Sequence, residues 1–329
     1  MRKRGKKIRQ TWLAANKFYL IPVMGFLFIV NSALSLAGLL VILFLYLSSV
    51  ARARLPIDPG GRFNRVTREY RTTGTGSLKL DVWYPARSKR PFPVVFFAHG
   101  GGWVSGFRNQ PNNVSWCRFL ASRGFAVVSI DYRYGLTSTM EEILSDYTAA
   151  LDYIRDNARS LDLDSENIIL MGLSAGGHLA LLYAAYYTNR NESKKITGIR
   201  GVTAYYAPSD LRDIFSSDDK SVFARFATAA TLKGTPRSSG EAYRYYSPIE
   251  WVTGNMVPVV VVHGREDTVV PFRSSTSLVR KMKSLGIHCR FLIHRNGGHG
   301  FETKRKDLRT TLILMETVKS MKEMTIHDH

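Results

Sequence analysis

The 329-residue sequence predicts an α/β protein with a mostly parallel sheet of eight strands flanked by helices. Two observations predict this class. Short apolar runs rich in Val, Ile and Phe recur along the chain, and from Val94 onward most of the segments between them have the spacing of amphipathic helices. Hydrophobic residues make up 45% of the chain and charged residues 22%, which excludes a disordered, collagen-like or coiled-coil protein.

The expected elements follow in order along the chain. Strands are predicted over residues 65–71, 78–84, 94–98, 125–130, 167–171, 201–206, 257–262 and 289–294. The clearest helical patterns cover residues 141–158, 175–187, 274–285 and 306–321. Residues 208–250 interrupt the alternation, and their many Phe and Tyr residues predict a small cap-like helical insertion over the sheet edge.

The N-terminal stretch has a different character. No charged residue occurs in 18–50, and as one helix this stretch would reach about 50 Å, against roughly 30 Å of bilayer core. We therefore predict a transmembrane anchor over 18–50. A cleaved signal peptide is the alternative, because Ala51-Arg52-Ala53 resembles a cleavage site, but the apolar region of such a peptide has only about 7–15 residues.

The charges beside this anchor predict its orientation. Seven basic residues lie in 1–17 and four in 52–65, so the positive-inside rule places a basic N-terminus in the cytoplasm. The remainder of this single-pass membrane protein would then lie on the lumenal, periplasmic or extracellular side. Residues 51–64, with two prolines and two glycines, are expected to form a linker to a folded domain over 65–329.

The net charge and the cysteines restrict the partners. The formal charge is +20, but residues 1–71 hold 13 basic and 2 acidic residues, so much of the excess lies around the apolar stretch. This distribution favours a membrane partner, through the anchor, over a nucleic acid. Two cysteines without CxxC spacing exclude a disulfide scaffold and a thiolate zinc site, and no metal or cofactor is predicted.

The first chemical signal is the motif Gly172-Leu173-Ser174-Ala175-Gly176. It follows an apolar strand and precedes a helix rich in Ala and Leu. A sharp turn between strand and helix exposes a serine hydroxyl, and small neighbours tolerate the backbone angles that such a turn needs. We predict Ser174 as a nucleophile; the alternative is a helix start capped by this serine.

The second signal is the run His99-Gly100-Gly101-Gly102-Trp103 at the end of a predicted strand. Consecutive glycines let main-chain N–H groups approach a ligand closely. Acyl transfer needs such donors where a carbonyl oxygen becomes an anion, so Gly101, Gly102 and Ala175 are predicted to form an oxyanion hole. A phosphate-binding loop is excluded because the GxxxxGK[ST] spacing is missing.

Two further loops supply an acid and a base. Asp267 follows the valine-rich strand 257–262, and His299 follows the last strand in a loop with three glycines. The order Ser174, Asp267, His299 is the order of a catalytic triad on this kind of sheet. We predict that His299 takes the proton of Ser174 and that Asp267 orients its imidazole. Glu266 is the alternative acid.

These motifs together resemble the esterase/lipase superfamily of α/β-hydrolases. The stretches HGGGW, GLSAGGHLA, DTVVP and GGHGF are similar to its hormone-sensitive-lipase and feruloyl-esterase-like branches. An apolar N-terminal stretch ahead of such a domain also resembles the prenylcysteine methylesterase-type enzymes. Leu173 departs from the lipase branch, which usually has Asp there. The resemblance implies a serine carboxylesterase with its catalytic domain over 65–329.

The substrate is expected to be a small-molecule or lipid-like ester with an apolar part. Trp103, Phe107 and Tyr132 are candidate pocket residues, together with aromatic residues of the 208–250 insertion; alternatively, the latter form the insertion's own core. Asp131 and Arg133 are interpreted as a structural ion pair. An amidase, formamidase or peptidase could use the same triad, a non-catalytic binding module is a third possibility, and no oligomeric state is predicted.

Overall fold

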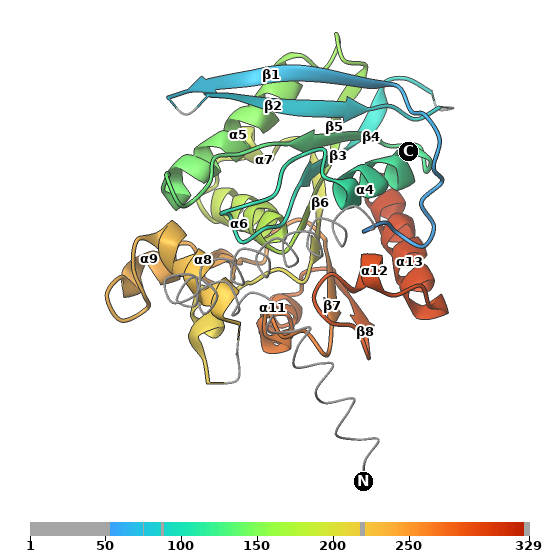
Figure 1. Cartoon of the computed structure of the whole chain (residues 1–329). Helices are drawn as coiled ribbons and strands as arrows, with labels where there is room; N and C mark the ends of the chain where they lie inside the picture. Colours follow the sequence, from blue (N-terminus) through green and yellow to red (C-terminus); the bar gives the residue numbers. More distant parts are fainter. Residues whose placement is uncertain (1–52, 75, 87–88, 218–220, 326–329) are drawn as a thin grey trace, which may run out of the picture. The chain divides into compact units, whose positions relative to one another are not determined.

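An eight-stranded sheet organises the part of the chain that the computed structural model describes, residues 53–325 without 75, 87–88 and 218–220. Its strand order is β1-β2-β4-β3-β5-β6-β7-β8 (Figure 1). Strands β1, β2 and β4 pair antiparallel at one edge, and every pair from β4 to β8 is parallel. The strands are β1 (Arg65–Thr73), β2 (Gly76–Trp83), β3 (Phe92–Ala98), β4 (Ala126–Ile130), β5 (Leu163–Leu173), β6 (Ile199–Tyr205), β7 (Val259–Gly264) and β8 (Cys289–His294).

Helices cover both faces of this sheet. They are α4 (Pro111–Ala121), α5 (Met140–Asp156), α6 (Ala175–Asn189), α7 (Ser193–Ile196), η1 (Leu211–Phe215), α8 (Val222–Leu232), α9 (Gly240–Tyr245), α10 (Pro248–Trp251), α11 (Phe272–Ser284), α12 (Phe301–Lys304) and α13 (Leu308–Thr325). Helices α5, α6 and α11 bury apolar side chains in one core, and α4 and α13 do so in the other. The predicted mostly parallel sheet flanked by helices is confirmed.

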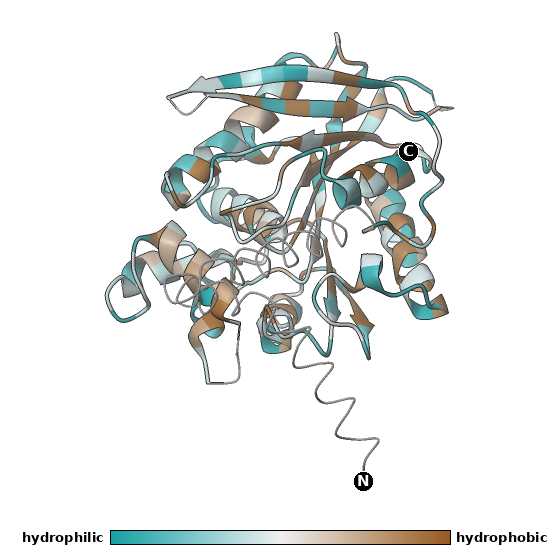
Figure 2. Cartoon of the chain, viewed as in Figure 1, coloured by the Kyte–Doolittle hydropathy of each residue, from teal (hydrophilic) through white to brown (hydrophobic). Residues whose placement is uncertain are grey.

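Strand β3 shows why the sheet needs both layers. Val94 and Phe96 belong to one core while Val95 and Phe97 belong to the other, because successive side chains of a strand point to opposite faces. All four side chains are fully buried. Figure 2 accordingly shows hydrophobic residues concentrated in the central strands, whereas β1 at the edge is exposed along most of its length. The central parallel strands are therefore rigid, and residues at their ends are held in fixed positions.

The expected location in a membrane needs correction. Within the described ranges, no helix is both long enough and apolar enough to cross a bilayer. Helix α6 has 15 residues and spans about 22 Å, short of the roughly 30 Å required, and the 18-residue α13 carries five charged side chains. This finding overturns the predicted single-pass location with its cytoplasmic N-terminus. The predicted anchor, residues 18–50, and the segment 1–17 lie outside the described residues.

Candidate active site

Ser174 lies on the sharp turn that joins β5 to α6. Its φ of 51° and ψ of −115° place a non-glycine residue in a strained conformation, of the kind that exposes a nucleophile. Two glycines make the turn possible. A Cβ at Gly172 would lie 2.1 Å from the carbonyl carbon of Gly176, and a Cβ at Gly176 would lie 2.1 Å from the carbonyl oxygen of Ala98. Neither position can therefore carry a side chain unless the backbone of the turn moves.

The glycine loop after β3 lies directly against this turn. A Cβ at Gly100 would lie 3.5 Å from the Cβ of Ser174. Gly101 and Gly102 have φ values of 122° and 62°, which favour glycine. Neither of their N–H groups donates a hydrogen bond to another described residue. A Cβ at Gly102 would also lie 2.8 Å from that of Ala227, so this loop contacts α8.

The acid and the base come from the loops after β7 and β8. Nδ1 of His299 lies 2.8 Å from Oδ2 of Asp267, whose side chain is fully buried. Among the described residues, Ser174 Oγ forms no hydrogen bond with His299. The alternative acid, Glu266, is 62% exposed and lies 3.9 Å from Arg305 instead. The structure thus brings Asp267, rather than Glu266, to the imidazole.

Four donors surround the Asp267 carboxylate. Besides His299, Oδ1 accepts hydrogen bonds from the N–H groups of Val269 and Val270, and Nε2 of His263 lies 3.1 Å from Oδ2. Burial alone would raise the pKa of Asp267, but the charge of His299 and the bonds from both histidines hold this pKa below its usual range. Asp267 is therefore an anion wherever the fold persists near neutral pH.

His263, at the end of β7, contacts both Asp267 and helix α11. Its Nδ1 lies 2.7 Å from the hydroxyl of Ser275, which can donate to it, leaving the Nε2 hydrogen for Asp267 Oδ2 and the Val270 carbonyl oxygen, each 3.1 Å away. The ring is fully buried. The sequence does not predict this contact, although it places His263 four residues before Asp267.

A second buried carboxyl, Glu302 on α12, lies behind His299. Its Oε1 accepts the hydroxyl of Tyr206 at 2.7 Å, and the Tyr206 ring lies 4.5 Å from the imidazole of His299, centroid to centroid. Oε2 is buried without a hydrogen-bond partner, and burial raises the pKa of Glu302. No pattern in the sequence points to this contact, because Tyr206 and Glu302 are 96 residues apart.

The three predicted pocket residues occupy different environments. Trp103 is buried, with its ring 5.0 Å from that of His178. Tyr132 is buried as well, stacks on His99 and donates its hydroxyl to the His99 carbonyl at 2.7 Å, so it supports the base of the glycine loop. Phe107 is 46% exposed.

The aromatic residues of the insertion divide in the same way. Tyr243 is fully buried and packs against Phe215 at 5.5 Å between ring centroids, as expected for a small core of the insertion. Phe223 reaches the glycine loop, because a Cβ at Gly102 would lie 3.2 Å from its ring. Phe226 is 56% exposed.

The predicted ion pair between Asp131 and Arg133 is wrong. Asp131 pairs with Arg108 at 2.5 Å, whereas Arg133 pairs with Asp146 at 2.7 Å. The partners come from the loop after β3 and from α5, and folding brings them closer than the chain neighbours. Both pairs hold the loop after β4 in place beside the glycine loop.

Comparison with known proteins identifies the family. Residues 80–282 match the BD-FAE family model. The esterase LipC of Mycobacterium tuberculosis is 30% identical over 68% of this chain and 57% of its own length. A probable isoprenylcysteine alpha-carbonyl methylesterase of Oryza sativa is 29% identical over 67% of this chain and 55% of its own length. The chain thus spans about half the length of the curated relatives it matches.

Solved structures share the fold. A truncated carbohydrate esterase from gut microbiota superposes with a TM-score of 0.66 at 22% identity, covering 80% of this chain and 96% of its own. Esterase 2 of Thermogutta terrifontis, with propionate bound, gives 0.65 at 23% identity, with the same coverage. Because the family model matches more than half of the sequence, the chain belongs to the BD-FAE family of α/β-hydrolases.

Proposed function

We propose that this chain is a carboxylesterase that cleaves its substrate through the triad Ser174, His299 and Asp267. The observation that carries the proposal is the 2.8 Å contact between His299 and a fully buried Asp267 at the edge of the sheet where Ser174 sits on a strained turn. The names of the relatives support an ester rather than an amide as the substrate.

Acylation is the first half of the reaction. With Nδ1 bonded to Asp267, the imidazole of His299 presents Nε2 as the base for the Ser174 hydroxyl. This contact forms when the substrate is bound, as catalytic hydrogen bonds often do. The serine oxygen bonds to the ester carbonyl carbon, its proton passes to Nε2, and the N–H groups of Gly101, Gly102 and Ala175 stabilise the oxyanion. The bond to the alcohol oxygen then breaks, and Nε2 returns the proton to the alcohol.

Deacylation repeats these steps with water. His299 takes a proton from a water molecule, whose oxygen bonds to the acyl carbon. The bond to Ser174 breaks, and the serine oxygen recovers the proton as the acid leaves. Asp267 stays ionised throughout and stabilises the imidazolium that forms twice in each turnover.

The substrate's apolar group is proposed to lie beside α8. Phe223 and Ala227 on this helix adjoin Gly102, so an acyl or alcohol chain bound at the glycine loop would contact them. Phe107 and Phe226 add exposed apolar surface in the same part of the fold. We accordingly propose residues 65–329 as the catalytic domain and 208–250 as its cap-like insertion.

Covalent labelling combined with a chain-length series tests the proposal. The wild type should react with a fluorophosphonate probe and hydrolyse p-nitrophenyl esters, and the matching p-nitroanilides should be much poorer substrates. Ser174→Ala should abolish labelling and lower kcat/KM by at least about 10⁴-fold. An unlabelled wild type, or an active Ser174→Ala variant, would contradict the triad. A faster reaction with the anilides would instead indicate an amidase.

A further inference from the structure

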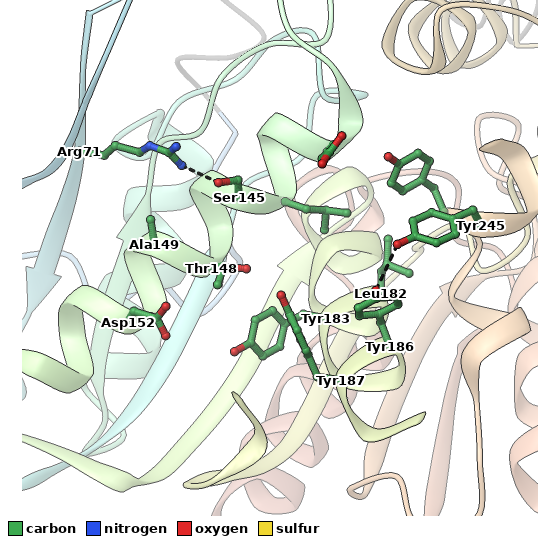
Figure 3. Close-up of a pocket in the computed structure, with 13 residues that line it drawn as sticks. Arg71, Ser145, Thr148, Ala149, Asp152, Leu182, Tyr183, Tyr186, Tyr187 and Tyr245 are labelled. Atoms are coloured by element: carbon green, nitrogen blue, oxygen red, sulfur yellow. Dashed lines mark hydrogen bonds between the residues drawn. The ribbon is translucent and has the colours of Figure 1, made fainter. Parts of the chain in front are cut away.

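A cavity lies between α5, α6 and α9, away from the triad (Figure 3). It has a volume of about 630 Å³, within the range of small-molecule sites. Ser174 begins α6, and Leu182 to Tyr187 lie 8 to 13 residues further along this helix, which corresponds to about 12–20 Å. We call this cavity the tyrosine pocket, because five of its lining residues are Tyr183, Tyr186, Tyr187, Tyr245 and Tyr246.

The tyrosine rings form a continuous aromatic wall. Ring centroids are 4.7 Å apart for Tyr183 and Tyr187, 5.2 Å for Tyr186 and Tyr187, and 5.9 Å for Tyr186 and Tyr245. The hydroxyl of Tyr245 bonds that of Tyr186, and this bond raises the pKa of Tyr245. Burial raises the pKa of Tyr183 and Tyr246. Tyr183, Tyr245 and Tyr246 are therefore neutral near pH 7. The Tyr183 ring is buried at the base of this wall, and the other rings offer apolar faces with polar tips.

The opposite wall is polar. In Figure 3, Thr148 and Asp152 of α5 face Tyr183 and Tyr187 of α6, with Arg71 of β1 beyond Ser145. This wall offers both donors and acceptors: a guanidinium, a carboxylate and two hydroxyls.

The two charges of this wall are already neutralised. Arg71 pairs with Asp146 at 2.9 Å, and Asp152 pairs with Lys195 at 2.7 Å. Neither charge therefore needs a counter-ion from a ligand. One further lining carboxylate, Glu141, is exposed, and water screens it.

These features restrict the class of ligand. An anion would find no unpaired cation in this wall and would meet Glu141, and a cation would find only that one exposed, uncompensated charge. A purely apolar ligand would remove water from the polar wall without replacing its hydrogen bonds, which is costly. The remaining class is a neutral ring that combines C–H faces with several hydroxyl groups.

We propose that the tyrosine pocket binds a sugar unit of a neutral oligosaccharide, with its C–H face on the tyrosine rings and its hydroxyls on the α5 wall. This site is separate from the triad and does not require it. In an esterase it would hold a carbohydrate-linked substrate at a distance from the ester bond.

Binding can be measured without catalysis. Calorimetric titration of the Ser174→Ala protein with cellotetraose, xylotetraose and mannotetraose should detect binding of at least one sugar. In the same background, Tyr187→Ala should weaken this binding about tenfold or more, because it removes a stacking surface. Tyr187→Phe should keep most of the affinity. Leu312→Ala, an exposed position on α13, is the matched control and should change nothing.

Titration with choline tests whether the pocket binds a cation instead of a sugar. Activity shows whether the Tyr187→Ala variant is folded. With Ser174 intact, Tyr187→Ala should hydrolyse p-nitrophenyl acetate at the wild-type rate. Failure of all three sugars to bind, sugar binding that Tyr187→Ala leaves unchanged, or choline binding that Tyr187→Ala removes would each overturn the proposal. Because the titrations use an inactive protein, these outcomes do not depend on whether the proposed esterase function holds.

Discussion

The loop after β7 and the short helix α12 each bury a carboxyl group beside His299, yet the two groups are held in opposite ways. Asp267 accepts two backbone N–H bonds and lies within reach of two histidine rings, and its pKa is lowered. Glu302 accepts the Tyr206 hydroxyl at Oε1, its Oε2 is buried without a hydrogen-bond partner, and burial raises its pKa. Two carboxyl groups that are both buried therefore have pKa values shifted in opposite directions, because their hydrogen-bond partners and neighbouring charges differ.

The largest expected effect separates the two carboxyls by activity. Asp267→Asn keeps the shape but removes the charge that stabilises the His299 imidazolium, so kcat should fall by about 10⁴-fold. Glu266→Gln is the matched control on the adjacent residue and should stay within about twofold of wild type, since exposed substitutions change little. Steady-state kinetics with a p-nitrophenyl ester measures both. Equal losses in the two variants would remove the distinction between these neighbours.

The next prediction concerns the second donor to Asp267. His263→Leu leaves Oδ2 with one histidine instead of two, and a hydrogen bond to a charged group contributes about 1.5–3 kcal/mol. The free energy of unfolding in urea should fall by this amount at pH 7. The wild-type value in the variant would mean that His299 and the backbone donors hold the carboxylate without His263.

A smaller effect is expected on the Glu302 side. Tyr206→Phe removes the hydroxyl that donates to Oε1 and leaves this buried acceptor unsatisfied, at a cost of about 1–3 kcal/mol. Glu302→Gln combined with Tyr206→Phe should recover part of this loss, because no charge is then buried. Urea denaturation of the single and double variants measures the coupling. A double variant no more stable than Tyr206→Phe would show that the charge of Glu302 is not what costs stability.

The smallest effect is the dependence of stability on pH. The folded pKa of Asp267 is lowered. Its contribution to the free energy of unfolding is complete above the unfolded pKa of about 3.9 and is lost as the pH falls toward the folded pKa. The folded pKa of Glu302 is raised. Its contribution to the free energy of unfolding is complete below the unfolded pKa of about 4.3 and is lost as the pH rises through the folded pKa.

Two variants separate these contributions. Glu302→Gln should lose less stability than wild type as the pH rises from 4 to 8, whereas Asp267→Asn should lose less as it falls from 4 to 2. Thermal unfolding followed by circular dichroism at matched pH values gives both slopes. Parallel curves for the two variants would contradict the opposite pKa shifts.

The sheet could be predicted closely because its strands are short apolar runs with polar boundaries. All eight strands lie where the pattern places them, although β5 begins at Leu163, four residues before the predicted start. The polar segment Asp164–Glu166 reads as a loop, yet it extends the strand beside Phe92 and Pro93. Helix α4 was not predicted, because it begins with Pro-Asn-Asn and buries its apolar face in only 11 residues.

The candidate site was also predictable only in part. Ser174, Asp267 and His299 follow strands in recognisable motifs, so the sequence locates them, and their catalytic roles stay predictions. His263 and Glu302 were missed as parts of the site because their contacts are side-chain bonds made by folding. The wrong pairing of Asp131 with Arg133 has the same origin, since closeness along the chain does not decide which charges meet.

The contact between Gly102 and Ala227 makes these two positions dependent on each other. A methyl group at 102 would collide with the methyl at 227, 2.8 Å away, so the penalty for alanine at one position depends on the residue at the other. Removing the methyl at 227 relieves that collision but not the strain of a positive φ at 102. Evolutionary change at position 102 of the glycine loop therefore depends on position 227 of helix α8. A side chain at 102 costs less stability once residue 227 has become smaller.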